Sequence, residues 1–399
     1  MIKKDRVILF LLLLLPLTVI DTTINQVYLF AIMPIAFLYC FSVSPGTFKQ
    51  RYIIIFFIIL IWHCICAMVL SNYERDTIIV IRQIIGTYIY GYVFFTIATR
   101  NESNLKWLYL IIFSYYFINW ITAIVYANLL QIDVTSDRLQ GATDVDEINA
   151  NRFGYFTLFF TFVLFIYGTL SKNQRGKKAF RFLFLSYIFV ILLTAIVTGS
   201  RQILILNIPL YLILLFLRYK NSFFNPIVIV NTTVLATLLF IFLAPELLQI
   251  YDGSVLQKRT ESTTIKEDQR TYLFYKGIDT GTENIIFGIG PGMFLVKYSM
   301  VTHCSYSEIF AETGIIGLLL FLILLFDCFY VQLKRYFKTK DEVFLYFAIF
   351  VFFYILDNLF FIFYESFLLM SMFFITAVHS DLYFKKYNST SRQGLYHLR

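Results

Sequence analysis

Residues 52–70 read YIIIFFIILIWHCICAMVL, a run without a single Asp, Glu, Lys or Arg. Because a helix needs about 20 mostly apolar residues to cross the hydrocarbon core of a bilayer, this run predicts a membrane-spanning helix. The whole chain is of this kind: 59% of its 399 residues are hydrophobic and 15% are charged, against about 25% charged in a typical soluble domain. Too few polar side chains exist to cover a soluble fold. The composition excludes a soluble enzyme, a disordered chain and a disulfide-rich secreted module.

Similar apolar runs recur along the chain and predict an all-α, polytopic transmembrane helical bundle of about 12 spans. The expected spans are residues 7–20, 27–43, 52–70, 78–98, 107–130, 153–170, 182–198, 202–217, 226–245, 308–331, 343–356 and 359–381. No internal repeat or low-complexity stretch interrupts the series, so we expect one integral membrane domain over residues 1–399. The five cysteines lie mostly within apolar runs and are interpreted as small core residues.

The positions of Lys and Arg predict the orientation of this bundle. If the chain crosses the membrane at each predicted span, every second connecting segment lies on the same side. Most of the 33 basic residues fall in one of these two sets of segments, and short basic segments face the cytoplasm. These segments are 3–6, 49–51, 100–106, 172–181, 218–220, 334–340 and 385–399. We therefore expect both termini inside, and we interpret the net charge of +8 as an orientation signal that needs no nucleic-acid partner.

Two long segments fall on the predicted outer side. Residues 131–151 are acidic, and residues 246–307 form a long extracytoplasmic loop before the tenth span. Long loops on one face of a membrane protein commonly carry its function.

Three arginines on this outer side are singled out as candidate ligand contacts, because positive charge is disfavoured in short outer loops. Arg152 lies where the acidic segment enters a span, Arg201 lies in the short turn between two spans, and Arg270 lies in the long loop. A guanidinium at the outer surface suits a lipid-linked phosphate or pyrophosphate, because its planar fork can bind two oxygens at once. The alternative for each is a snorkelling side chain or a plain ion pair.

The long loop continues with a glycine-rich stretch, 287–294, which reads FGIGPGMF. Alternating glycines with a proline predict a tight, non-helical turn. The turn could form a backbone nest for an anion or serve only as a structural re-entry turn. It lacks the strand–turn–helix setting of a dinucleotide-binding loop.

The next stretch, 302–317, reads THCSYSEIFAETGIIG and enters the tenth span. On a helix, Glu308 and Glu312 share one face. His303 is the only histidine on the predicted outer side, and an imidazole is a natural proton acceptor for a sugar hydroxyl. His303 or a nearby carboxylate is therefore the candidate base, and an ordinary surface histidine is the alternative.

Two charged residues fall within expected spans. Arg82 lies in the fourth span and Glu365 in the last, where a charge is costly unless it is paired or faces a wet cavity. The two are candidate partners for each other. Asp357, with Asn358, marks the tight outer turn between the last two spans.

The order of these motifs resembles the O-antigen polymerase and O-antigen ligase superfamily. The resemblance rests on Thr-Gly-Ser-Arg at 198–201, the loop arginine Arg270, the Gly-x-Gly-x-Gly-x-Phe pattern, and the stretch from His303 to Gly317. The resemblance covers about positions 150–320. The first 150 residues agree with the family only in their general character and carry none of these motifs.

That resemblance implies a membrane-embedded glycosyltransferase of the C type (GT-C) on the outer face of a bacterial inner membrane. Such enzymes take a glycan from undecaprenyl pyrophosphate and use no metal or other cofactor. Carried onto this chain, Arg201 and Arg270 would bind the donor pyrophosphate, and His303 would contact the acceptor hydroxyl or the reacting centre. From the residues alone, Arg152 is a further candidate contact for the pyrophosphate, and Glu308 is a candidate base beside His303. The implied partners are the lipid-linked oligosaccharide, membrane lipid and a chain-length regulator protein.

Within the family, a polymerase joins one lipid-linked chain to another lipid-linked repeat unit, and a ligase moves the chain to lipid A-core. Cys304 stands where many relatives, and ligases in particular, have Asn after the histidine. The chain also holds 46 Phe and 29 Tyr, a bias associated with surface-polysaccharide polymerases. These features favour polymerase, with ligase as the alternative. A lipid-linked oligosaccharide flippase or transporter is the further alternative, although such proteins are expected to show internal repeats.

Overall fold

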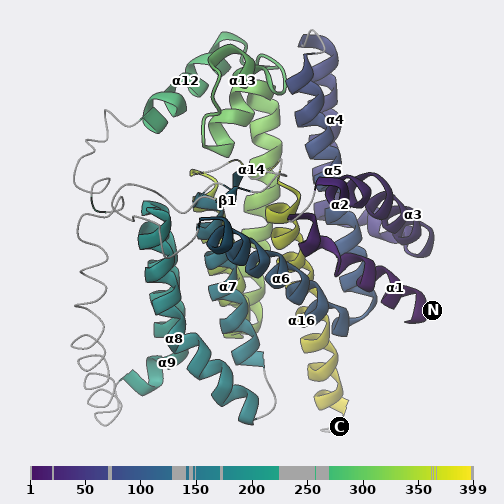
Figure 1. The fold of residues 1–399 in the computed structure, drawn as a ribbon. Coiled ribbons are helices and arrows are strands. Elements are labelled where there is room, and N and C mark those ends of the chain that lie inside the picture. Colours follow the sequence, from purple (N-terminus) through teal and green to yellow (C-terminus); the bar gives the residue numbers. More distant parts are fainter. Residues whose placement is uncertain are drawn as a thin grey trace. The chain divides into compact units, whose positions relative to one another are not determined.

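The computed structural model describes residues 2–19, 22–70, 74–127, 141–142, 147–148, 150–170, 174–223, 257, 269–360, 362, 364 and 366–396. The chain divides into two compact units (Figure 1). One unit is formed by Met1–Tyr115 with Ile265–Arg399, and the other by Tyr116–Thr264. We refer to them as unit 1 and unit 2 and describe each by itself.

The regular elements described in unit 1 are all helices. Its N-terminal elements are α1 (Ile2–Leu12), η1 (Leu15–Val19), α2 (Thr22–Val27), η2 (Tyr28–Ile32), α3 (Met33–Val43), η3 (Pro45–Lys49), α4 (Arg51–Leu70), α5 (Arg75–Arg100) and the first part of α6 (Glu102–Ala127). Its C-terminal elements are α12 (Gln269–Glu283), α13 (Met293–Tyr298), α14 (Ser305–Thr339), α15 (Glu342–Asp357) and α16 (Phe367–Tyr396).

Unit 2 contains the rest of α6 and a second group of helices. They are α7 (Ala150–Leu170), α8 (Gln174–Thr198), η4 (Ile203–Asn207) and α9 (Ile208–Phe223). The described strands of this unit are the short β1 (Gly141–Ala142) and β2 (Glu147–Ile148), which pair antiparallel. The prediction of an all-α protein therefore holds for all but these four paired residues of the described chain.

Five described helical segments are long and apolar enough to cross a membrane. They are Thr23–Val43, Arg51–Leu70, Arg75–Arg100, Phe153–Leu170 and Ser305–Thr339. Each overlaps a span predicted from the sequence, because an uninterrupted apolar run favours helix whichever neighbours it acquires. The protein is thus an α-helical membrane protein. The expected span at 226–245 lies outside the described residues, and the count of 12 stays a prediction.

The last expected span, 359–381, begins later than predicted. The chain turns after α15, and α16 starts at Phe367. One reason is visible in the backbone: the carbonyl of Asn358 accepts a hydrogen bond from the N–H of Ser305 at 2.9 Å. That carbonyl therefore serves the start of α14 and not a helix of its own.

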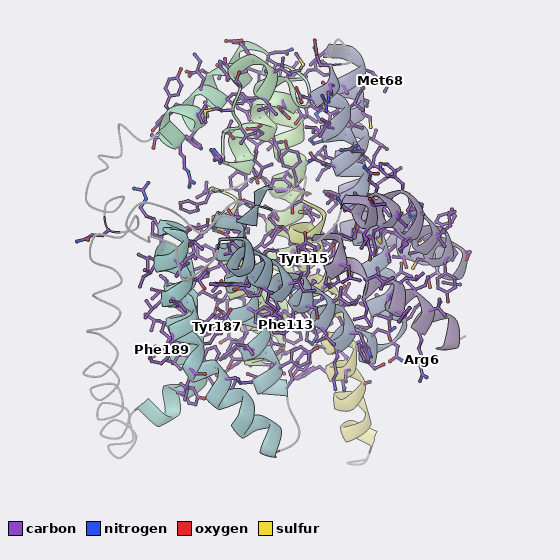
Figure 2. The ribbon with its side chains drawn as sticks, in the orientation of Figure 1. Arg6, Met68, Phe113, Tyr115, Tyr187 and Phe189 are labelled. Atoms are coloured by element: carbon purple, nitrogen blue, oxygen red, sulfur yellow. The ribbon has the colours of Figure 1, made fainter. Side chains whose placement is uncertain are left out.

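The core of unit 1 is built where α5 and α16 pack closely. From Thr87 to Ala98 nearly every residue of α5 is buried. Gly91 allows the close approach, since a Cβ atom there would lie 2.5 Å from the ring of Phe374. The helices of unit 1 also expose apolar side chains at the surface of the bundle. One example is Met68 near the end of α4, which is 63% exposed (Figure 2). Exposed apolar side chains on such helices are what lipid contact requires.

Polar side chains tie the helices together at the predicted inner end of unit 1. Arg335 of α14 forms an ion pair with Asp381 of α16 and donates to the hydroxyl of Ser380 at 2.9 Å. Tyr109 of α6 contacts His379 of α16 at 2.9 Å. Charges within a bundle are tolerated when they are paired in this way.

Candidate functional site

The best-defined polar site of unit 1 lies at the start of α14. Figure 1 shows α12 and α13 at the end of the unit where α14 begins. This is the predicted outer side. The segment 299–304 leads into the helix and carries His303, and the side chains around it form a connected set of hydrogen bonds.

Glu308 holds the backbone of the segment that carries His303. Its side chain is 2% exposed, and its Oε2 accepts the N–H of Thr302 at 2.7 Å. Thr302 in turn donates its hydroxyl to the carbonyl of Cys304 at 2.9 Å. Both neighbours of His303 are therefore fixed, and Glu308 has a clear positioning role in addition to the base role predicted from the sequence.

His303 adopts a left-handed backbone conformation with φ of 58°, which is uncommon for residues other than glycine. Its side chain is half-buried. The adjacent Cys304 thiol is buried, and burial raises its pKa. The thiol is therefore protonated at neutral pH and is a poor nucleophile. Of the two neighbouring side chains, the imidazole of His303 is the one suited to proton transfer.

The glycine-rich loop closes onto a break in α14. Gly288, Gly290 and Gly292 all have positive φ. The N–H of Ile289 donates to the carbonyl of Ala311 at 2.8 Å, and that of Gly290 donates to the carbonyl of Glu312 at 2.9 Å. Two loop N–H groups are therefore engaged inside the protein. This favours the structural re-entry turn over an anion nest.

The break itself is at Gly314, whose φ of 68° and ψ of −167° are non-helical. The N–H of Ile315 donates across to the carbonyl of Ile285 at 2.7 Å. In addition, Nε1 of Trp62 donates to the carbonyl of Thr313 at 2.9 Å. The backbone groups that the break frees are thus paired with the loop and with α4, as groups at membrane depth must be.

A buried polar layer lies behind this break. The hydroxyl of Tyr364 donates to Oε2 of Glu312 at 3.4 Å, and its ring lies 5.5 Å from that of His63. Nδ1 of His63 contacts the carbonyl of Ile59 at 2.8 Å and must carry a proton there, because a carbonyl can only accept. The sequence singled out Glu312, but no local pattern marks Tyr364 or His63 as its neighbours.

Arg270 lies in the first turn of α12 and is half-exposed. Further along, α12 packs tightly on the site: a Cβ atom on Gly277 would lie 2.9 Å from the side chain of Thr302. Seven residues separate Arg270 from this contact, about 10 Å along the axis. A hydrogen bond to Glu283 of α12 raises the pKa of Lys297 on α13, so the two loop helices are also joined by charge.

In unit 2, Arg201 follows a tight helix end. Gly199 has φ of 59°. The N–H of Ser200 donates to the carbonyl of Ala195, and the N–H of Gly199 to that of Ile196, both at 3.2 Å. This is a Schellman motif, which ends α8 at its glycine. Half-exposed Arg201 comes directly after it.

The segment that follows Arg201 packs against the start of α7. The side-chain amide of Asn207 donates to the carbonyl of Gly154 at 2.8 Å, and a Cβ atom on Gly154 would lie 3.1 Å from Ile203. Arg152 is two residues before Gly154, in the first turn of α7. Unit 2 therefore brings the Arg152 and Arg201 positions to the same end, and unit 1 brings His303 and Glu308 together.

Two further points concern the predicted Arg82–Glu365 pair and metal binding. Glu365 lies outside the described residues, so its pairing with Arg82 stays a prediction. The described residues contain no group of three or more His, Cys, Asp or Glu side chains that could hold a metal ion.

The geometry of Glu308 leads to a test of its role. Glu308→Gln keeps an oxygen that can accept the Thr302 N–H, so we expect it to retain both stability and transfer activity. Glu308→Ala should lose about 1–3 kcal/mol of unfolding free energy, because a buried N–H is left without a partner. Thermal unfolding in detergent and a transfer assay measure the two effects. Loss of transfer in Glu308→Gln with an unchanged unfolding midpoint would instead identify Glu308 as the base.

Comparison with known proteins bears on this arrangement. Residues 186–322 match a family model described as O-antigen ligase. No curated protein matches the chain. The matched segment runs from within α8 to within α14 and contains Arg201, Arg270, His303 and Glu308. It confirms, over these residues, the sequence-based resemblance to the O-antigen ligase and polymerase superfamily. A glycan-transferring enzyme acting in a membrane is the broad function that this match supports.

Proposed function

We propose that this protein is a surface-polysaccharide (O-antigen) polymerase of the membrane-embedded C type. It transfers a glycan from undecaprenyl pyrophosphate to a second lipid-linked repeat unit. The observation that carries the proposal is the family match over 186–322, a segment that contains Arg201, Arg270 and the His303–Glu308 site. We further propose that it lies in the bacterial inner membrane with both termini in the cytoplasm and the site on the outer face.

The proposed reaction breaks the bond between the anomeric carbon and the pyrophosphate oxygen. It forms a bond from the same carbon to a hydroxyl oxygen of the acceptor. Negative charge develops on the departing pyrophosphate, and the guanidinium groups of Arg201 and Arg270 would stabilise it as it forms. The two guanidinium groups are proposed to do so without a metal, with Arg152 as a further candidate contact.

The acceptor hydroxyl must lose its proton as the new bond forms. His303 is the proposed acceptor of this proton, because its imidazole can take up a proton near neutral pH. The hydrogen bonds of Glu308 and Thr302 hold the backbone around it. A fixed base supports catalysis because the reacting groups then need little rearrangement.

The competing function is that of an O-antigen ligase, which is favoured by the description of the matched family. The replacement of the usual Asn by Cys304 favours the polymerase. The arginines cannot separate the two functions, because both enzymes would use the same donor. The acceptor does separate them. A chain-length regulator protein would be a partner of the polymerase.

A deletion strain tests the choice. Without a polymerase, lipid A-core should carry at most one repeat unit, because a separate ligase can still transfer it. Gel analysis of the surface glycan and of the extracted carrier lipid gives the result, and the wild-type gene on a plasmid is the control. Bare core together with long polymer on undecaprenyl pyrophosphate would overturn the proposal in favour of the ligase.

A further inference from the structure

The outer half of α5 presents a bare face with a charge at its centre. Arg82 is exposed there, seven residues or about 10 Å along the helix from Arg75 at its start. Ile78 and Ile85, 58% and 40% exposed, flank Arg82 on the same face. From Thr87 to Ala98 nearly every residue of α5 is buried, so the bare face is confined to the outer half of the helix.

The space beside this face is open. A Cβ atom placed on Gly86, one turn below Arg82, would meet nothing within 4 Å. The opposite side of the same turns is packed, with Val80 and Ile84 buried. The helix is therefore held from behind, and an apolar surface with a guanidinium at its centre is presented on a fixed backbone.

The guanidinium of Arg82 makes the centre of this face positive, while Glu74 and Asp76 lie on either side of Arg75 at the start of the helix. Within the described residues, the structure records no ion pair or hydrogen bond for Arg82. Arg75 adds a second cation on the same face, since residues seven apart share one side of a helix. Asp76 lies about a quarter-turn away, where α5 meets Gly292 of the glycine-rich loop. An arginine within a span is costly unless a charged partner, a ligand or a wet cavity neutralises it.

The pattern fits a ligand with an apolar tail and an anionic head. Isoleucine side chains would pack against a branched hydrocarbon chain, and the guanidinium would bind phosphate oxygens. A neutral sugar would not use the isoleucines, and a soluble anion would not reach an arginine below the membrane surface. A lipid-borne phosphate satisfies both halves of the face.

We infer that this face of α5, with Arg82 at its centre, binds the pyrophosphate and the first isoprenoid units of the acceptor's undecaprenyl carrier. The inference rests on the proposed polymerase function, in which both substrates hang from the same carrier. Arg201 and Arg270 serve the donor in that proposal, so the acceptor needs a phosphate contact of its own. A ligase, whose acceptor is lipid A-core, would have no use for a second carrier site.

A binding experiment tests the inference without any transfer step. The purified full-length chain in nanodiscs is titrated with undecaprenyl pyrophosphate, and native mass spectrometry counts the bound lipids. The wild type should bind a second carrier that Arg82→Leu does not bind. Gln83→Leu is the matched control, because it removes an exposed polar side chain at the same depth and should keep both carriers. Equal unfolding midpoints would show that the variants are folded.

Kinetics give an independent measure. Arg82→Leu should raise the KM for the lipid-linked acceptor about tenfold or more and leave kcat near the wild-type value, as expected for a charged hydrogen bond lost from binding. Arg82→Lys should recover part of this loss, because a point charge replaces the fork only in part.

Three outcomes would overturn the inference. Unchanged carrier binding in Arg82→Leu would make Arg82 a snorkelling side chain. Displacement of the second carrier by an equal amount of phosphatidylglycerol would make the face an ordinary headgroup contact. Displacement by inorganic pyrophosphate alone would remove any role for the isoleucines. The polymerase assignment is tested separately, by the glycan of the deletion strain. A failure of that assignment can therefore be distinguished from a failure of the carrier-binding inference.

Discussion

Replacing Arg270 by alanine is expected to lower glycan transfer at least about a hundredfold, the usual cost of removing one preorganised group that stabilises developing negative charge. Arg201→Ala should have the same effect, because both guanidiniums are proposed to contact the same pyrophosphate. Lysine at either position should restore only part of the activity, since an ammonium group cannot form the paired contact of a planar fork. Transfer is measured with purified protein and a lipid-linked substrate.

Lys297→Ala is a suitable control for these variants. Lys297 is another cation on the predicted outer side of the matched segment, and its contact is with Glu283 at 3.1 Å. Because both side chains are exposed, the pair contributes little to stability, and this variant should keep its activity. Full activity in Arg270→Ala, with normal protein yield, would show that Arg270 serves only as a structural contact of its loop.

The second large effect is expected at Gly314. Its φ of 68° and ψ of −167° fall in a region that is essentially restricted to glycine. A Cβ atom there would lie 2.3 Å from the backbone oxygen of Ile286, which cannot move without breaking the loop contact. We therefore expect Gly314→Ala to cost about 3 kcal/mol or more and to abolish activity.

Size-exclusion chromatography and thermal unfolding in detergent would measure this loss. Gly46→Ala is the matched control, because a Cβ atom at Gly46 would meet nothing within 4 Å and its φ is not positive. That variant should unfold at the wild-type temperature. An unchanged unfolding midpoint in Gly314→Ala would mean that the break in α14 is not needed for the fold.

The spans were predictable because their signal is local. The apolar run 52–70 corresponds to α4 at Arg51–Leu70, and the run 78–98 lies within α5 at Arg75–Arg100. Each needs only length and composition to favour a helix in lipid. The short helices α12 and α13 within the expected loop 246–307 were not predicted, because neither has a long apolar run and α12 is held by its packing on α14.

In the candidate site, too, the features with a local sequence signal were predictable and those that depend on distant residues were not. The tight turn before Arg201 and the non-helical glycine loop followed from glycine's freedom at positive φ. The break at Gly314 did not, because the sequence there reads as an uninterrupted helix and the break depends on carbonyls of Ile285 and Ile286. The partner of Glu312 was equally hidden, since Tyr364 lies 52 residues from Glu312 in the chain. Contacts at such separations have no local sequence pattern.

The pairing of the glycine-rich loop with the break in α14 has a consequence for biogenesis. Residues 285–290 are synthesised before α14, so the N–H groups of Ile289 and Gly290 leave the ribosome ahead of the carbonyls they will bind. On the predicted topology they are already across the membrane when α14 enters it. The backbone groups at the break in α14 can then form hydrogen bonds with the loop as the helix inserts. They do not have to remain unpaired in the lipid. The order of elements along the chain thus matches the order in which the membrane must receive them.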